Sequence, residues 1–209
     1  MLYFSALILL PFLLFLSIIN FSKRKSYDTT HSLIFFAIIF AFVGETLMTF
    51  CAWYFKNNIP VYNSLSLFEF SFFFVFYYKI IGQGLNRFVY FLLLLIFFTS
   101  YSIELADKGL SSMFSYSFLY ENSILIFLAI VAFLKMINKP QDSLISDYSV
   151  FWINTAVLTY FSCTFFIFGL RKYTVHLPAL TLVTLYLHLF FIFVFYSLLS
   201  MGLWKTSKK

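Results

Sequence analysis

The chain has 209 residues, of which 62% are hydrophobic, 24% aromatic and only 11% charged. A soluble domain is about half apolar and about a quarter charged, so this composition excludes an ordinary water-soluble fold and indicates lipid as the main solvent. The net charge of +6 does not indicate nucleic-acid binding, because the basic residues lie in short loops between apolar runs.

Seven apolar runs follow one another along the chain. Continuous runs are typical of membrane-spanning helices, whereas a membrane β-barrel shows short alternating segments. The first run has no basic residue before it and no cleavage site after it, so we expect a retained helix. The sequence predicts an all-α integral membrane protein with one transmembrane domain over residues 1–209, its helices at about 2–20, 32–54, 61–78, 88–103, 113–134, 148–170 and 178–202.

Charged or helix-breaking residues separate the apolar runs. Pro11 predicts a kink inside the first helix. Lys23–Lys25 form a basic loop after it, and residues 56–60 form a tight turn before the third helix. Residues 135–147 form the longest loop, and Pro178 suits the first turn of the last helix.

The distribution of Lys and Arg predicts the orientation. With seven spans, the side of the N-terminus holds four of these residues and the opposite side holds ten. Because cytoplasmic loops are enriched in Lys and Arg, we expect the N-terminus outside and the C-terminus in the cytoplasm of a bacterial inner membrane.

Four ionisable residues lie inside apolar runs, where a charged side chain costs roughly 2.5–3.5 kcal/mol. Glu69 is the only charge between Val61 and Tyr78, and Glu45, Glu121 and His188 are placed similarly. At ~1.5 Å per helical residue, all four lie roughly 12–15 Å below the outer surface. The sequence therefore predicts one layer of ionisable groups between the outer surface and the membrane centre.

Helical spacing places further polar residues on the faces that carry these groups. We expect the second, third, fifth, sixth and seventh helices to surround a polar interior, and the first and fourth to face more lipid. The candidate pocket residues are Glu45, Glu69, Glu121, His188, Asn154, Thr159 and Thr184. The alternative is that these side chains only hydrogen-bond between helices and fix their packing.

Catalytic and cofactor motifs are missing from the sequence. It contains no HExxH, GxSxG or P-loop, and the last span has no lysine that could hold retinal. Cys51 and Cys163 form no CxxC or Cys/His cluster, so we expect free thiols, no metal and no cofactor.

Two short motifs resemble an uncharacterised family of small seven-helix membrane proteins from Bacteroidota. The first is Tyr62–Asn63 followed by Leu67–Phe70, and the second is Phe151–Asn154 leading to Tyr160–Ser162. The family has no established activity, and the resemblance implies a role in signalling.

We therefore expect a sensing or ligand-binding membrane module, not an enzyme, that contacts lipid and acts through another membrane protein. One alternative is a small transporter that uses the carboxylates as a proton or cation relay. A further alternative is an intramembrane lipid hydrolase with Glu69 and Glu121 as an acid/base pair.

Overall fold

A computed structural model describes residues 2–22, 27–138, 144–174 and 177–205. Within these ranges the chain forms seven α-helices and no strand, as the sequence predicts. The helices are α1 (Leu2–Ser22), α2 (Thr29–Tyr54), α3 (Ile59–Ile81), α4 (Arg87–Lys108), α5 (Tyr116–Ile137), α6 (Ser149–Thr174) and α7 (Pro178–Lys205). Two short 3-10 helices, η2 (Gly82–Gly84) and η3 (Ile145–Asp147), precede α4 and α6.

Six of the helices, α2 to α7, are long and apolar enough to cross a membrane. Their outward surfaces carry large apolar side chains, such as Phe88 and Phe91 on α4, which are 67% and 62% exposed. Trp53 near the end of α2 and Trp204 near the end of α7 are also exposed. Tryptophan at both ends of apolar helices is typical of the two membrane–water interfaces.

Short polar segments end the helices where the chain must turn. The Asp28 carboxylate accepts hydrogen bonds from the backbone N–H groups of Thr30 and His31 and so caps the start of α2. The Asn86 side chain caps α4 in the same way. Gly109 adopts a φ of 67° at the end of α4, a conformation that side chains disfavour.

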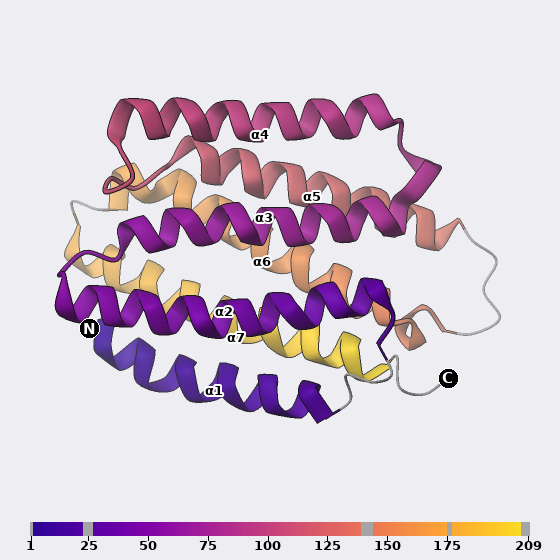
Figure 1. The fold of residues 1–209 in the computed structure, drawn as a ribbon, viewed down its shortest axis with the longest axis horizontal. Helices are drawn as coiled ribbons and strands as arrows, with labels where there is room; N and C mark the ends of the chain where they lie inside the picture. Colours follow the sequence, from indigo (N-terminus) through magenta and orange to yellow (C-terminus); the bar gives the residue numbers. More distant parts are fainter. Residues whose placement is uncertain (1, 23–26, 139–143, 175–176, 206–209) are drawn as a thin grey trace.

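The helices lie side by side in two layers (Figure 1). In Figure 1, α1, α2 and α3 lie in front of α7 and α6, and α4 lies along the edge next to α5. α2, α3, α5, α6 and α7 form a closed ring of neighbours, in which each helix contacts the next and α7 contacts α2. α1 packs outside this ring on α2 and α7, and α4 packs outside it on α5.

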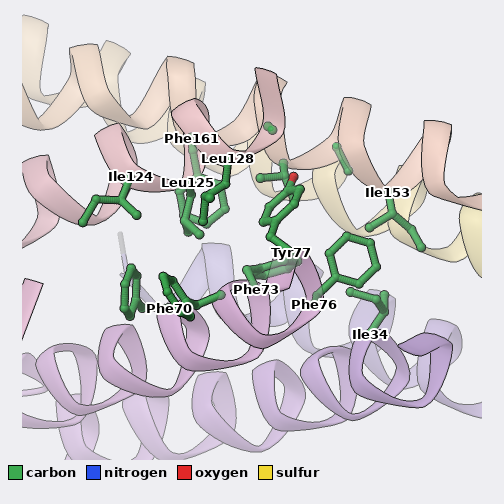
Figure 2. Close-up of a cluster of buried hydrophobic side chains, with 14 of the residues drawn as sticks. Ile34, Phe70, Phe73, Phe76, Tyr77, Ile124, Leu125, Leu128, Ile153 and Phe161 are labelled. Atoms are coloured by element: carbon green, nitrogen blue, oxygen red, sulfur yellow. The ribbon is translucent and has the colours of Figure 1, made fainter. Parts of the chain in front are cut away.

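One half of the ring is filled by apolar side chains, and we call it the closed half. It is the half in which α2 begins and α3 and α7 end. Its side chains come from all five ring helices and are at most 1% exposed: Ile34, Phe35, Phe76, Tyr77, Leu125, Leu128, Ala129, Ala132, Ile153, Ala156, Val157, Leu199 and Leu203. Figure 2 shows part of this core, where side chains of α3 meet those of α5 and α6. Since lipid is as apolar as these side chains, close packing is what favours this contact.

Polar contacts fix the register of the helices inside the closed half. The Tyr77 hydroxyl donates to the Asn154 side-chain oxygen at 2.7 Å, and Asn154 Nδ2 donates to the Ala129 carbonyl at 2.9 Å. These bonds join α3, α6 and α5. At the end of the same half, His31 contacts Asp28 at 2.7 Å and Ser149 at 2.9 Å, which links α2 to α6.

The opposite end of the bundle is held by Asn63 and Glu104. Asn63 Nδ2 donates to the carbonyls of Leu110 and Ser112, which pins the loop between α4 and α5 to α3. The Glu104 carboxylate accepts from the backbone N–H groups of Ser115 and Ser117 and from Lys108. A carboxylate at a helix start satisfies N–H groups that lack partners within the helix, so Glu104 caps α5 from the neighbouring helix.

Candidate functional site

A cavity of about 90 Å³ lies in the other half of the ring. All five ring helices line it, as the sequence predicts for the polar interior, and none of the described side chains of α1 and α4 lines it. Glu45 of α2, Glu69 of α3, Glu121 of α5 and His188 of α7 all lie in its wall. The four ionisable residues of the predicted layer therefore share one cavity.

Helical periodicity explains how α3 and α7 contribute to the wall. Tyr62, Ser66, Glu69 and Phe73 line the cavity from α3 and are spaced by three or four residues, which places them on one face. His188, Ile192 and Tyr196 do the same from α7, with a spacing of four.

Small residues bring α2 close to α3 beside the cavity. Ala37 and Ala41 line the cavity from α2, together with Glu45. A Cβ atom at Gly44 would lie only 2.5 Å from the Leu65 side chain of α3, so the leucine side chain packs directly against the glycine.

The Glu121 side chain lies deepest among the carboxylates. Glu121 is 2% exposed, whereas Glu45, Glu69 and His188 are half-buried. The Ser66 hydroxyl of α3 donates a hydrogen bond to Glu121 Oε2. This bond links α3 to α5 at the cavity wall. It uses only one oxygen of the carboxyl group and does not involve the second, Oε1.

Three buried polar atoms of lining residues have no hydrogen-bond partner in the part of the chain that the structure describes. They are Glu121 Oε1, Asn122 Nδ2 and His188 Nδ1. Asn122 is 3% exposed. Because an unpaired buried polar atom costs about 1–3 kcal/mol, bonds from a guest inside the cavity would relieve this cost.

The ionisable side chains of the cavity are mainly acidic. Three carboxyl groups line it, and no Lys or Arg is among the lining residues whose side chains the structure describes. Isolated negative charge in an apolar medium is very costly. The cluster is therefore stable only when bound protons or a cation neutralise it.

Aromatic side chains form most of the remaining wall. The rings of Tyr62 and Phe118 lie 5.0 Å apart, and Phe118 stacks on Phe168 at 5.1 Å, near the ends where α3 and α5 begin. Phe73 and Phe161 line the side next to the closed half, where both contact the buried Phe195. The cavity thus lies between two groups of packed rings.

The closed half separates the cavity from the end of the bundle where α7 ends. Below Phe73 and Phe161, the ring is filled by fully buried side chains such as Leu128, Ala129 and Val157. Figure 2 shows Leu128 of α5 beside Tyr77 and Phe73 of α3 in this part of the bundle. None of the buried side chains that fill the closed half lines the cavity.

Three of the seven candidate pocket residues lie outside the cavity. Asn154 lies in the closed half, where its hydrogen bonds to Tyr77 and Ala129 make it a packing contact. Thr184 Oγ1 donates to the Thr181 carbonyl of its own helix, and neither Thr184 nor Thr159 lines the cavity. The spacing of residues along a helix gives the direction of a face only approximately. It does not show how closely a neighbouring helix packs against that face.

Several lining residues were not among the predicted ones. Asn122, Tyr160 and Tyr196 line the cavity together with Ser66 and Tyr62. Tyr196 lies eight residues after His188, two steps of four on the same face, so helical spacing alone would have found it. No comparable signal in the sequence marks Asn122, which follows Glu121 directly.

The arrangement does not favour direct coordination of a metal ion. Within the described ranges, no three His, Cys, Asp or Glu side chains lie close enough to hold one. The cavity instead offers dispersed acceptors and aromatic surface, which suits protons or a small organic cation.

Comparison of the chain with protein-family models, curated proteins and solved structures finds no match. The geometry of the cavity therefore carries the functional interpretation by itself.

Proposed function

We propose that this protein is a sensing or ligand-binding module of a bacterial inner membrane, with seven spanning helices around a cavity that takes a small polar ligand. One observation carries the proposal: three carboxyl groups and a histidine from four helices meet at a cavity in which buried polar atoms have no partner among the described residues. Such groups are expensive inside a membrane, and a functional role is their usual explanation.

The closed half favours binding over passage through the protein. A transporter needs access to its site from both sides in turn. Here the side of the cavity towards the end of α7 is filled by packed side chains that are at most 2% exposed, among them Phe161, Leu128 and Ile153. A ligand that enters this cavity remains bound, or leaves by the way it came.

The orientation in this proposal places the cavity in the outer half of the membrane. Ten of the 14 Lys and Arg residues lie on the side of the C-terminus if all seven helices span, and such residues favour the cytoplasm. Tags at the two termini should therefore differ in protease accessibility in spheroplasts: the N-terminal tag is cleaved and the C-terminal tag is protected.

A ligand bound between five helices can alter how these helices pack. The proposed output is a change in contact with a partner membrane protein, for which apolar surfaces such as that of α4 are exposed.

Ligand-induced stabilisation of the purified protein tests the proposed binding. A panel of small amines, alcohols, acids and amides is added to the wild type and to Ala41→Phe, in which a larger side chain fills the cavity from α2. Val43→Phe adds the same group at an outward position of α2 that is 46% exposed, and it serves as the matched control. A ligand that binds the folded protein raises its melting temperature.

We expect at least one compound to stabilise the wild type and Val43→Phe but not Ala41→Phe. A panel in which no compound stabilises the wild type more than Ala41→Phe would contradict the proposed function.

A further inference from the structure

The unpartnered atoms in the cavity define what a ligand must offer. Glu121 Oε1 is an acceptor when ionised, and it needs an N–H or O–H donor. Asn122 Nδ2 is a donor and needs an acceptor oxygen or nitrogen. His188 Nδ1 takes either role, depending on its tautomer. A complementary ligand therefore carries donors at one end and an acceptor nearby.

The net charge of the wall decides the sign of the ligand. Glu45, Glu69 and Glu121 bring three carboxyl groups, and among the described side chains His188 is the only basic one that lines the cavity. An anion would meet like charge, and a neutral ligand would leave the carboxyl groups protonated. A cation bound at Glu121 gains a charge-assisted hydrogen bond, which is roughly twice as strong as a neutral one.

Aromatic rings beside the ionisable groups favour an organic cation. The Tyr160 and Phe168 rings each lie 6.2 Å from the His188 ring, and all three residues line the cavity. Ammonium groups are attracted to the faces of such rings. A bare divalent metal ion gains little here, because its ligands would have to lie closer together than they do within the described ranges.

The volume limits how much of a ligand lies inside the cavity. A cavity of about 150 Å³ holds benzene with its six carbon atoms, so about 90 Å³ accommodates roughly four non-hydrogen atoms. A primary ammonium, a two-carbon chain and one hydroxyl group fill this volume.

On the basis of the proposed function, we propose that the cavity binds a small primary ammonium compound that also carries a hydrogen-bond acceptor. The ammonium group donates to Glu121 Oε1, and the acceptor receives a hydrogen bond from Asn122 Nδ2. Ethanolamine has this chemistry, both as a free molecule and as the head group of phosphatidylethanolamine.

Protection from carbodiimide labelling tests this assignment. Dicyclohexylcarbodiimide modifies protonated carboxyl groups that it reaches from an apolar phase, and peptide mass spectrometry locates the modified residues. We expect labelling of Glu69 or Glu121 in the purified protein, and protection by ethanolamine. At ten times its dissociation constant, ethanolamine should slow the labelling about tenfold, whereas ethylene glycol, which lacks the ammonium group, should not protect.

Matched variants test which residue binds each end of the ligand. Glu121→Gln should weaken ethanolamine binding, measured by calorimetry, by about 10- to 100-fold, the range for the loss of one charged hydrogen bond. Asp107→Asn removes one negative charge at an exposed position near the end of α4 and should leave binding unchanged. In the wild type, ethanolamine should bind more tightly than ethylamine, and Asn122→Ala should remove this difference.

Reconstitution in vesicles separates the two sources of the ligand. Protection in vesicles that contain phosphatidylethanolamine, and not in vesicles of phosphatidylglycerol alone, assigns the site to the lipid head group. Protection that requires added ethanolamine in both kinds of vesicle assigns it to the free amine. Either result supports the proposed ligand chemistry.

Two outcomes overturn the ammonium assignment. Equal protection by ethylene glycol and ethanolamine would show that charge plays no part. Stabilisation of the wild type, but not of Ala41→Phe, only by compounds without an ammonium group would overturn the assignment while the proposed function stands. If no compound of the panel stabilises the wild type, both fail.

Discussion

Polar residues inside the helices serve two purposes, and their position along the bundle decides which. Glu45, Glu69, Glu121 and His188 lie where the side chains leave a cavity. Asn154 lies where the ring is filled, and both ends of its amide group are bonded there. The same kind of residue thus forms a polar surface in one half of the protein and a packing contact in the other.

Removal of the Asn154 side chain should lower stability without a change in ligand affinity. Asn154→Ala leaves the buried Tyr77 hydroxyl and the Ala129 carbonyl without these partners, which should cost about 1–3 kcal/mol. Thermal unfolding in detergent measures the loss, with Thr159→Ala of the same helix as a control that should change stability by under about 0.5 kcal/mol. Weaker ethanolamine binding in a folded Asn154→Ala variant would contradict this division of roles.

The Asp28 cap at the start of α2 predicts a pH dependence of stability. Burial raises the pKa of this carboxyl group, but hydrogen bonds from His31 and Thr30 and the positive charge of His31 outweigh it, so the pKa lies below the ordinary value of 3.8. A lowered pKa in the folded state means that the stabilisation is complete above pH 3.8 and disappears as the pH falls through the lowered pKa.

Melting temperatures of the wild type and Asp28→Ala between pH 3 and pH 7 test this cap. The wild type should be more stable by about 1 kcal/mol at neutral pH, and the difference should shrink below about pH 4. Asp28→Asn keeps a capping side chain that does not titrate, so its advantage over Asp28→Ala should be independent of pH. A wild-type advantage that grows as the pH falls from 4 to 3 would contradict the assigned hydrogen bonds.

The sequence indicates well that the ionisable residues lie at one level along the bundle, and it indicates their partners poorly. Counting residues from the ends of the apolar runs placed Glu45, Glu69, Glu121 and His188 in one layer, and the structure places them in one cavity. Depth follows from the constant helical rise, which needs no tertiary information. The bond from Ser66 to Glu121 and the bond from Tyr77 to Asn154 depend on which helices are neighbours, and the spacing of residues within one helix does not specify this.

At the scale of elements, the apolar runs predicted the seven helices correctly, but they did not predict all of the residues at which the helices begin and end. α4 was expected to end near residue 103 and continues to Lys108, because Glu104 pairs with Lys108 one turn later and remains helical. α5 was expected from residue 113 and begins at Tyr116, after the segment that Asn63 and Glu104 hold. A charged residue at the end of an apolar run therefore does not mark the end of the helix.

Close approach of α6 and α7 depends on Gly202. A Cβ atom there would lie 2.6 Å from Ile153 Cγ1 and 3.1 Å from the Ser149 carbonyl oxygen. Gly202→Ala should therefore force the helices apart and cost about 1–3 kcal/mol in unfolding free energy. Gly169→Ala in α6 is the control, since its nearest contact is 3.9 Å from Leu119 and an alanine within a helix should stabilise by about 0.5–1 kcal/mol. Equal effects of the two substitutions would show that the helices are not closely packed at Gly202.

The whole molecule consists of a ring of five helices, with a hollow half and a closed half, and of α1 and α4 packed outside the ring. The composition of the chain predicts the membrane environment, and the polar faces indicate which helices form the ring. The position and size of the cavity depend on how the aromatic rings of Tyr62, Phe118, Phe168, Phe73 and Phe161 pack. In a chain with 33 phenylalanines, no pattern in the sequence selects these rings from the others.

Cysteine accessibility tests the division into two halves most directly. In a background with Cys51→Ser and Cys163→Ser, single cysteines are introduced by Ala41→Cys in the cavity wall and by Ala129→Cys in the closed half. Both changes replace alanine and add only one sulfur atom. The purified protein is treated with a small water-soluble thiosulfonate that carries a primary ammonium group, and modification is followed by mass spectrometry.

The structure predicts that Ala41→Cys is modified under native conditions, that ethanolamine slows this reaction, and that Ala129→Cys reacts only after denaturation. Comparable modification of both variants in the native protein, or modification of Ala129→Cys alone, would contradict a polar cavity bounded by a closed apolar half.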